Sequence, residues 1–181
     1  MGASGWSYFV PYQQDIEQAL QQLREQVFAS GDFLNHKAIE VEWLRAQDDQ
    51  AYHEYQQRDR EFWQSQEVEP PETEARQQRI ARLEQEQTTI AGLFLDDEGE
   101  GTHSILDIYA LSDTAAYHTA ILLPLEKVQE IFGTEHPPHT MIELRMKEVM
   151  LEAVGRWIGA YIVIWKDDQP DEIFFFGFSG D

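Results

Sequence analysis

The spacing of apolar residues predicts a helix near the start of the chain. Residues on one helical face recur every three or four positions, and this period is met by Ile16, Leu20, Leu23 and Val27. Asp15 is suited to cap the first turn, and Gly31 is suited to end the helix. We therefore expect an amphipathic helix over residues 15–31.

A polar middle segment carries two further helical patterns. Over residues 37–66 Ile39 and Trp43 stand one turn apart, and Asp48 and Asp49 separate this turn from a second helix. A proline pair at 70–71 then forbids a continuous helix. Over residues 74–89 the apolar stripe is thin, so that helix must lie on the surface or pair with its predecessor.

The second half of the chain has a different period. Runs at residues 92–95, 104–111 and 119–123 are typical of strands, and residues 124–132 of a short helix closed by Gly133. Thr140 and Glu143 form a capping box ahead of an apolar pattern that reaches Gly155. Residues 161–165 and 173–178 predict a hairpin whose apolar runs are too continuous for a sheet with one wet face.

Together these patterns predict an α+β fold in a single domain over residues 1–181. An antiparallel or mixed sheet comes from the C-terminal half and is covered by the helices that begin near Asp15 and Met141. Residues 37–89 form a helical insertion or subdomain. This middle part is rich in glutamine, since 16 of the 18 glutamines precede residue 91.

Charge narrows the range of partners. The 181 residues include 34 acidic and 13 basic side chains, a formal charge of −21, together with 42% hydrophobic residues. Such a chain folds with an anionic surface, which disfavours nucleic acid and anionic membranes and favours basic proteins or cations. The chain has no cysteine, no apolar run long enough to span a membrane and no N-terminal signal pattern, so we expect a cytoplasmic protein.

An acidic segment at residues 96–107 has the outline of a calcium loop. Oxygen-bearing side chains stand at its first, third, fifth and twelfth places, and glycine at its sixth, where such loops bend sharply. The ligands of this hypothetical Ca²⁺ or Mg²⁺ site are Asp96, Glu98, Glu100 and Asp107. Glutamate at the third and fifth places and strand-like flanks depart from the pattern, and a solvated acidic hairpin loop is the simpler interpretation.

The same segment holds candidate catalytic residues. In a strand, His103 and Asp107 share one face, so they form a possible base and its orienting carboxylate, with His118 from a neighbouring strand. Ser104 points to the other face, which argues against a Ser-His-acid triad. A second histidine pair, His136 and His139, surrounds two prolines beside Glu135, but ligands so close on a stiff turn converge poorly on a metal.

Aromatic residues are concentrated in the polar half, among Glu, Asp and Gln rather than among basic residues. This context argues against stacking on nucleic acid. The rings either anchor thin helices or form an exposed contact for a protein partner, where Trp and Tyr are enriched. The partner-binding candidates are Trp43, Tyr52, Tyr55 and Trp63.

Three segments of the chain resemble a family of small uncharacterised bacterial proteins for which we know no activity. They are MGASGW at residues 1–6, GTHSILD at residues 101–107 and FGFSGD at residues 176–181. The resemblance covers the first 35 and last 90 residues and leaves the glutamine-rich middle unmatched. It implies a bacterial cytosolic protein and assigns no functional residue.

Three functions remain open from the sequence. We favour a non-enzymatic acidic protein that binds a basic partner, in the manner of an immunity protein or an inhibitor of a toxin or nuclease. The first alternative is a small hydrolase or metal-dependent enzyme that uses His103 and Asp107. The second is a divalent-cation-binding module at residues 96–107. The sequence does not specify an oligomeric state.

Overall fold

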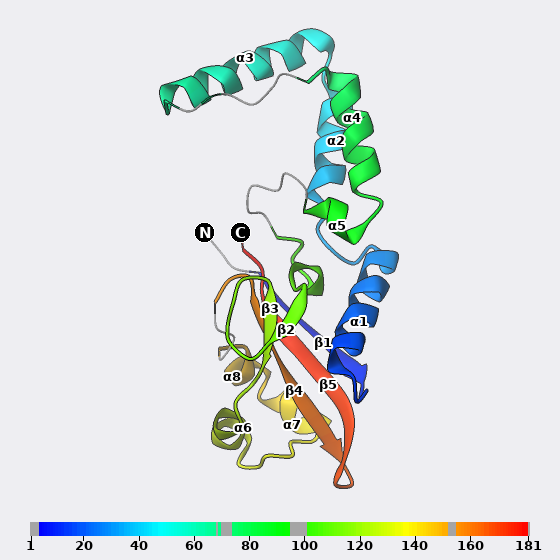
Figure 1. Ribbon diagram of the computed structural model, residues 1–181, viewed down its shortest axis with the longest axis vertical. Helices are drawn as coiled ribbons and strands as arrows, with labels where there is room; N and C mark the ends of the chain where they lie inside the picture. Colours follow the sequence, from blue (N-terminus) through cyan, green and yellow to red (C-terminus); the bar gives the residue numbers. More distant parts are fainter. Residues whose placement is uncertain (1–3, 68, 70–73, 95–100, 152–154, 181) are drawn as a thin grey trace. The chain divides into compact units, whose positions relative to one another are not determined.

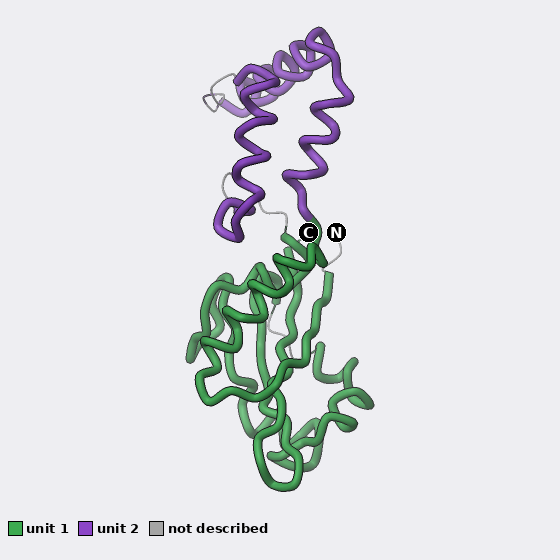
Figure 2. The backbone as a smooth tube through the Cα atoms, turned by 90° about the vertical axis from the view of Figure 1, so that its right-hand side faces the viewer, with its two compact units in different colours: residues 1–34, 98–181 green, residues 35–97 purple. Residues whose placement is uncertain are grey.

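The computed structural model describes residues 4–67, 69, 74–94, 101–151 and 155–180. The chain divides into two compact units, shown in different colours in Figure 2. Residues 1–34 and 98–181 form what we call the sheet unit, and residues 35–97 form the helical unit. The helical unit contains the segment 37–89 that the sequence marked as an insertion.

Within the described residues, five strands of the sheet unit form one mixed sheet (Figure 1). Its order is β1 (Gly5–Pro11), β5 (Gln169–Phe178), β4 (Ile158–Lys166), β3 (Thr119–Leu122) and β2 (Ala110–Ser112). β5 is antiparallel to β1 and β4, while β2, β3 and β4 run parallel. The predicted α+β class with a mixed sheet is confirmed, and the N-terminal apolar stretch adds an edge strand to it.

The predicted hairpin is confirmed as β4 and β5. Asp167 and Asp168 connect the strands with φ values of 50° and 60°, the left-handed conformation that a tight two-residue turn requires. One face of the sheet packs on helices α6 (Leu125–Phe132), α7 (His139–Leu144) and α8 (Met146–Leu151). That core consists of Leu123, Val128, Phe132, Ile142, Val149, Ala160, Ile162, Ile164, Phe174 and Phe176.

Helix α1 (Ile16–Ser30) has the ends that its sequence predicts. Asp15 accepts a hydrogen bond from the Gln18 N–H at 2.9 Å, and Gly31 closes the helix with φ of 72°. α1 lies beside η1 (Ile105–Asp107) and β2. The short helix α6 is likewise confirmed, with Gly133 at its end.

Two predicted strands are wrong. Residues 92–94 fall in α5 (Ile90–Leu93) and at its C-terminal end, because the Thr89 hydroxyl caps this turn by accepting from the Gly92 N–H at 3.0 Å, and residue 95 lies outside the described residues. The segment 104–111 does not run as one strand, since the Ser104 hydroxyl accepts from the Leu106 N–H at 3.2 Å and starts η1. Of this segment only Ala110 and Leu111 belong to a strand, β2.

The predicted helix near Met141 is present as α7, but its predicted cap at Thr140 is wrong. α7 begins at His139, two residues before Met141 and directly after Pro138, and no side-chain hydrogen bond caps it. Pro137 and Pro138 restrict the backbone ahead of His139, which is compatible with an earlier start. The helix then breaks at Arg145, where φ is −109° and ψ is 18°, and continues as α8.

The helical unit pairs α2 (His36–Ala46) with α4 (Arg76–Glu86). The helix over residues 74–89 therefore pairs with the first of the two helices before it, not with its immediate predecessor as the sequence suggested. α3 (Asp49–Ser65) begins at the predicted break, with Asp48 as its cap. A small core holds the unit together and consists of Val41, Leu44, Tyr52, Ile80 and Leu83. Of the helices in the described part of the chain, none has the length and apolarity that a bilayer span needs.

Candidate functional site

The three segments that carry the family resemblance meet at one end of the sheet. The Ser179 N–H donates to the Ser4 carbonyl at 2.9 Å, and the Gly101 N–H donates to the Gly180 carbonyl at 2.9 Å. The Ser179 hydroxyl donates to the Asp107 carboxylate. Residues about 70 to 175 positions apart in sequence are thereby held in one cluster.

Asp107 lies at the centre of this cluster and is completely buried. Its Oδ1 accepts from both the N–H and the hydroxyl of Thr102, each at 2.8 Å, and its Oδ2 accepts from Ser179. The Ser104 and Thr102 hydroxyls lie 2.8 Å apart. We call Thr102, Ser104, Asp107 and Ser179 the buried polar cluster.

Burial raises the pKa of Asp107 above its ordinary value, because the charged form loses its water. The donors from Ser179 and Thr102, and the nearby His118, act in the opposite direction and oppose this rise. The four side chains of the buried polar cluster are at most 4% exposed. A substrate therefore has no access to their hydroxyls in this conformation.

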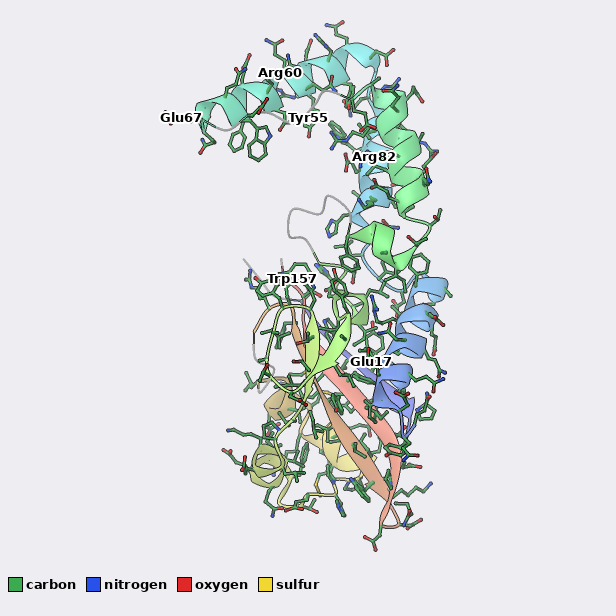
Figure 3. All side chains as sticks on the ribbon, in the orientation of Figure 1. Glu17, Tyr55, Arg60, Glu67, Arg82 and Trp157 are labelled. Carbon is green, nitrogen blue, oxygen red and sulfur yellow. The ribbon has the colours of Figure 1, made fainter. Side chains whose placement is uncertain are left out.

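His118 lies at the same end of the sheet, next to Asp107. Its Nδ1 lies 2.8 Å from the Asp107 carbonyl oxygen, and its ring stacks on Tyr109 with 4.5 Å between centroids. The Trp157 ring is tilted against the His118 ring with 4.9 Å between centroids, and Trp157 lies at this end of the sheet in Figure 3. The backbone bonds Tyr109 N–H to His118 O and His118 N–H to Trp157 O, both 2.7 Å, extend the ladder beyond the strands.

Three non-glycine residues at this end have left-handed backbones. His103, His118 and Trp157 have φ values of 55°, 59° and 64°. Such conformations cost about 1–3 kcal/mol each and persist only where the surroundings fix them. Here the backbone hydrogen bonds and the ring contacts hold His118 and Trp157 in this conformation. We therefore attribute their backbone strain to the packing at this end of the sheet.

The predicted catalytic pair lies in this region. His103 is half-buried, and Asp107 faces inward, with both carboxylate oxygens accepting from Thr102 and Ser179. Asp96, Glu98 and Glu100 of the predicted cation loop lie outside the described residues. Across the described residues no group of three or more His, Asp or Glu side chains is arranged to hold a metal ion.

The two histidines of the proline turn have separate partners. His136 stacks on Trp165 with 3.7 Å between ring centroids. His139 stacks on Phe9 at 4.2 Å, and its Nδ1 lies 2.5 Å from Oε2 of Glu172. The turn therefore fastens α7 to the sheet at two places.

We expect the His139 contact to make stability depend on pH. Glu172, and less strongly Glu143, raise the pKa of His139 above its ordinary value of about 6.5. The stabilisation is then complete below the unfolded pKa and disappears as pH rises through the folded one. Because the pair is partly exposed, His139→Gln should lower the unfolding free energy by about 0.5 kcal/mol more at pH 6 than at pH 9, where only the loss of the ring contact with Phe9 remains. Urea unfolding at both pH values measures this, and an equal loss at both would contradict the ion pair.

A second candidate surface lies on the helical unit. Trp43 of α2 contacts Tyr55 of α3 edge-on at 5.0 Å, and Phe62 contacts Trp63 edge-on at 5.5 Å. On α3 the residues 55, 62 and 63 share one face, since seven residues make two turns. We call Trp43, Tyr55, Phe62 and Trp63 the aromatic surface.

The aromatic surface is only partly covered. Phe62 is 56% exposed and Trp43 is 40% exposed, while Tyr55 and Trp63 are half-buried. Tyr52, the fourth partner-binding candidate from the sequence, is instead buried in the core and donates through its hydroxyl to the Glu74 carbonyl at 3.1 Å. Phe62 was not among those candidates, because residue type alone does not show which ring of the stripe escapes the core.

Cations of the helical unit are largely engaged within it. Lys37 and Arg45 of α2 pair with Glu86 and Glu84 of α4, and Arg79 of α4 pairs with Glu40. Arg76 and Arg82 bind Asp49, Glu74 and Glu86. Lys37 and Arg82 hold the pKa of Glu86 below its ordinary value although burial alone would raise it. The unit contains 15 acidic and 7 basic residues, so a negative excess remains beyond these pairs.

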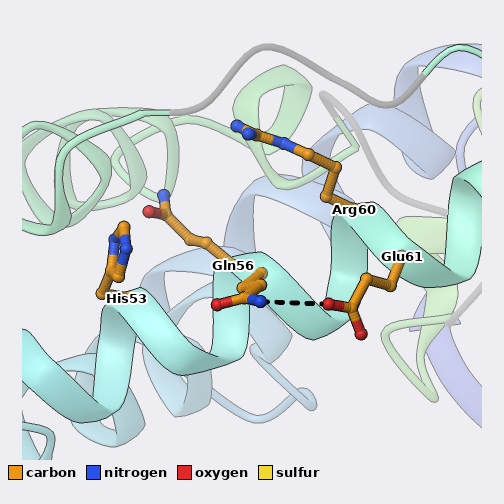
Figure 4. A pocket seen from close by; sticks show the side chains of 5 residues that line it. His53, Gln56, Arg60 and Glu61 are labelled. Atoms are coloured by element: carbon orange, nitrogen blue, oxygen red, sulfur yellow. Dashed lines mark hydrogen bonds between the residues drawn. The ribbon is translucent and has the colours of Figure 1, made fainter.

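A pocket lies on α3 (Figure 4). It is lined by His53, Gln56, Gln57, Arg60 and Glu61, and Gln57 donates to Glu61 at 3.1 Å. Figure 3 shows Arg60 and Tyr55 on different sides of this helix. His53 and Glu61 are eight residues apart, a rise of about 12 Å, so they do not converge on one ligand atom.

Comparison of the chain with protein-family models, with curated proteins and with solved structures gives no match.

Proposed function

We propose that this protein is a non-enzymatic binding protein for a basic protein partner, in the manner of an immunity protein or an inhibitor of a toxin or nuclease. The aromatic surface is its contact. The observation that carries the proposal is the exposure of Phe62 and Trp43 on an acidic helical unit whose lysines and arginines largely pair with its own carboxylates. Exposed aromatic rings supply contact area, and surrounding carboxylates select a basic partner.

The sheet end supports this proposal because its polar side chains are used internally. Asp107 binds Thr102 and Ser179 in a buried site, so the cluster is suited to fastening the C-terminal segment. An enzyme would need a carboxylate or hydroxyl within reach of substrate. The chemistry available at this end favours a structural role, which leaves binding as the function of the exposed surface.

Capture of partners from a bacterial lysate tests the proposal. Immobilised protein should retain a basic protein at low salt and lose most of it at high salt, because long-range attraction between exposed charges is screened. The double variant Phe62→Ala, Trp63→Ala should retain it at least 30-fold less, as expected for hot-spot rings. Leu144→Ala is the matched control, since Leu144 is an exposed apolar residue of the sheet unit.

The capture experiment compares wild type, Leu144→Ala and the double variant. Retention of a basic protein by wild type and by Leu144→Ala, with loss in the double variant, would support the proposal. Equal retention by all three proteins, or retention of no basic protein at either salt concentration, would contradict it.

A further inference from the structure

The two edge strands of the sheet, β2 and β1, differ in whether their outward backbone groups are hydrogen-bonded. β2 forms one edge, and two side chains of α1 bond to backbone groups of β2 and of Tyr109 directly before it. Gln21 donates to the Tyr109 carbonyl at 3.0 Å, and Glu17 accepts from the Leu111 N–H at 3.0 Å. Figure 3 shows Glu17 on α1. This edge is therefore closed to a further strand.

β1 forms the other edge, and its outward groups follow from its register. The Ser179 N–H donates to Ser4, and the Tyr12 N–H donates to Asp171 at 2.8 Å. Since hydrogen-bonded pairs alternate in an antiparallel ladder, Trp6, Tyr8 and Val10 bond to β5. Gly5, Ser7 and Phe9 direct their N–H and C=O groups away from the sheet. No described residue bonds to these outward groups.

β1 also lacks the devices that usually protect an edge. Such devices are lysine, proline within the strand, a bulge or a covering element. β1 pairs over seven residues without a bulge, and its proline stands at its last position, Pro11. Ser7 is exposed, and Phe9 is half-buried. The strand is thus long and regular enough to template another strand.

Carboxylates flank this edge on both faces of the sheet. On one face Asp32 lies near Tyr8, where it adds to the larger effect of burial in raising the pKa of the Tyr8 hydroxyl. On the other face Glu143 and Glu172 lie 3.6 and 2.5 Å from the His139 ring that stacks on Phe9. An incoming strand with basic side chains would find opposite charge above and below its backbone.

We propose that the edge of β1 binds an extended basic segment of a partner protein as a sixth strand of the sheet. Main-chain hydrogen bonds to Gly5, Ser7 and Phe9 provide the pairing, as in other cases of strand addition. The proposal rests on the proposed function for the charge of the partner and adds a second contact surface to it. A second copy of the chain is the less favoured occupant, because two chains of charge −21 repel each other.

A peptide experiment tests this edge separately from the aromatic surface. The probe is a capped seven-residue peptide of alternating lysine and valine, titrated at low salt by calorimetry. Ser7→Pro removes one outward N–H and leaves the bonds of Trp6 and Tyr8 to β5, so the strand should persist. We expect Ser7→Pro to bind the peptide about tenfold more weakly than wild type. Ser7→Thr, which keeps the N–H, should bind like wild type.

A second probe leaves the protein unchanged. The same peptide with N-methyl groups on alternate residues keeps its charge but loses one pairing edge, and it should bind wild type about tenfold more weakly. Equal binding of the two peptides, or equal binding by Ser7→Pro and wild type, would overturn the proposal. So would sedimentation equilibrium in which wild type is a dimer and Ser7→Pro a monomer, because the edge then binds a second copy.

The two proposals fail in different ways. The double variant Phe62→Ala, Trp63→Ala should bind the peptide like wild type, since these rings belong to the helical unit. Loss of peptide binding in Ser7→Pro alone therefore reports on the edge. Loss of lysate capture in the double variant alone reports on the proposed function.

Discussion

Replacing Asp107 by alanine should lower the free energy of unfolding by about 3–5 kcal/mol. The substitution leaves three buried donors without their acceptor, namely the Thr102 N–H, the Thr102 hydroxyl and the Ser179 hydroxyl. Each buried donor that loses its partner costs about 1–3 kcal/mol, less what relaxation recovers. Urea unfolding of wild type and variant at pH 7 measures the loss.

Asp107→Asn is the matched variant and should cost about 1 kcal/mol or less. The asparagine oxygen still accepts from Thr102, and its amide can donate to the Ser179 oxygen, so the cluster keeps its pairs. Comparable losses for alanine and asparagine would show that the cluster does not depend on these hydrogen bonds, which contradicts the structural role that we give it.

Comparison of wild type with Asp107→Asn also shows how ionisation of the Asp107 carboxyl affects stability. Because burial raises the pKa of Asp107, the carboxyl binds its proton more tightly in the folded than in the unfolded chain. Wild type should therefore gain stability relative to Asp107→Asn as pH falls through this pKa. Unfolding curves at pH 7 and pH 4 give the sign of the change.

Gly177→Ala should destabilise the sheet unit by about 3 kcal/mol. A Cβ on Gly177 would lie 2.5 Å from Cζ2 of Trp6 and 2.9 Å from the Ile158 carbonyl oxygen. The Trp6 ring is 5% exposed, so it has little room to move, and the Ile158 oxygen belongs to the backbone. Thermal unfolding followed by circular dichroism measures the effect.

Two further variants establish its cause. Gly5→Ala is the control, because its Cβ would lie 3.1 Å from the flexible end of Met150 and 3.1 Å from the Phe178 ring, with no backbone atom among its nearest neighbours, and we expect a loss below about 1 kcal/mol. In a double-mutant cycle, Trp6→Phe should recover part of the Gly177→Ala loss. Strict additivity of the two substitutions would show that the ring does not impose the requirement for glycine.

Elements with local signals were predictable from the sequence. Asp15 and Gly31 define the ends of α1 by capping chemistry within one turn, and the continuous apolar runs of β4 and β5 define a hairpin. The segment 104–111 was not predictable in the same way. Its apolar residues suit a strand, but the Ser104 hydroxyl and the inward turn of Asp107 start a 3₁₀ helix, and one partner of Asp107, Ser179, lies 72 residues away.

The candidate binding residues were likewise only partly predictable from the sequence. The sequence indicated Trp43, Tyr55 and Trp63, yet it could not separate them from Tyr52, which faces the core between the helices. Phe62 and Trp63 lie one position apart, and the structure shows which ring is more exposed. Likewise, resemblance marked the segments 101–107 and 176–181 without indicating that they touch, because the contact of Asp107 with Ser179 depends on the order of strands in the sheet.

The most direct test of the account compares the two surfaces in one titration. The basic partner captured from lysate is purified and titrated into wild type, into Phe62→Ala, Trp63→Ala, and into Asp107→Asn. We predict an affinity at least 30-fold lower for the aromatic double variant and an unchanged affinity for Asp107→Asn. Weakened binding by Asp107→Asn together with normal binding by the aromatic variant would place the function at the sheet end and contradict the account.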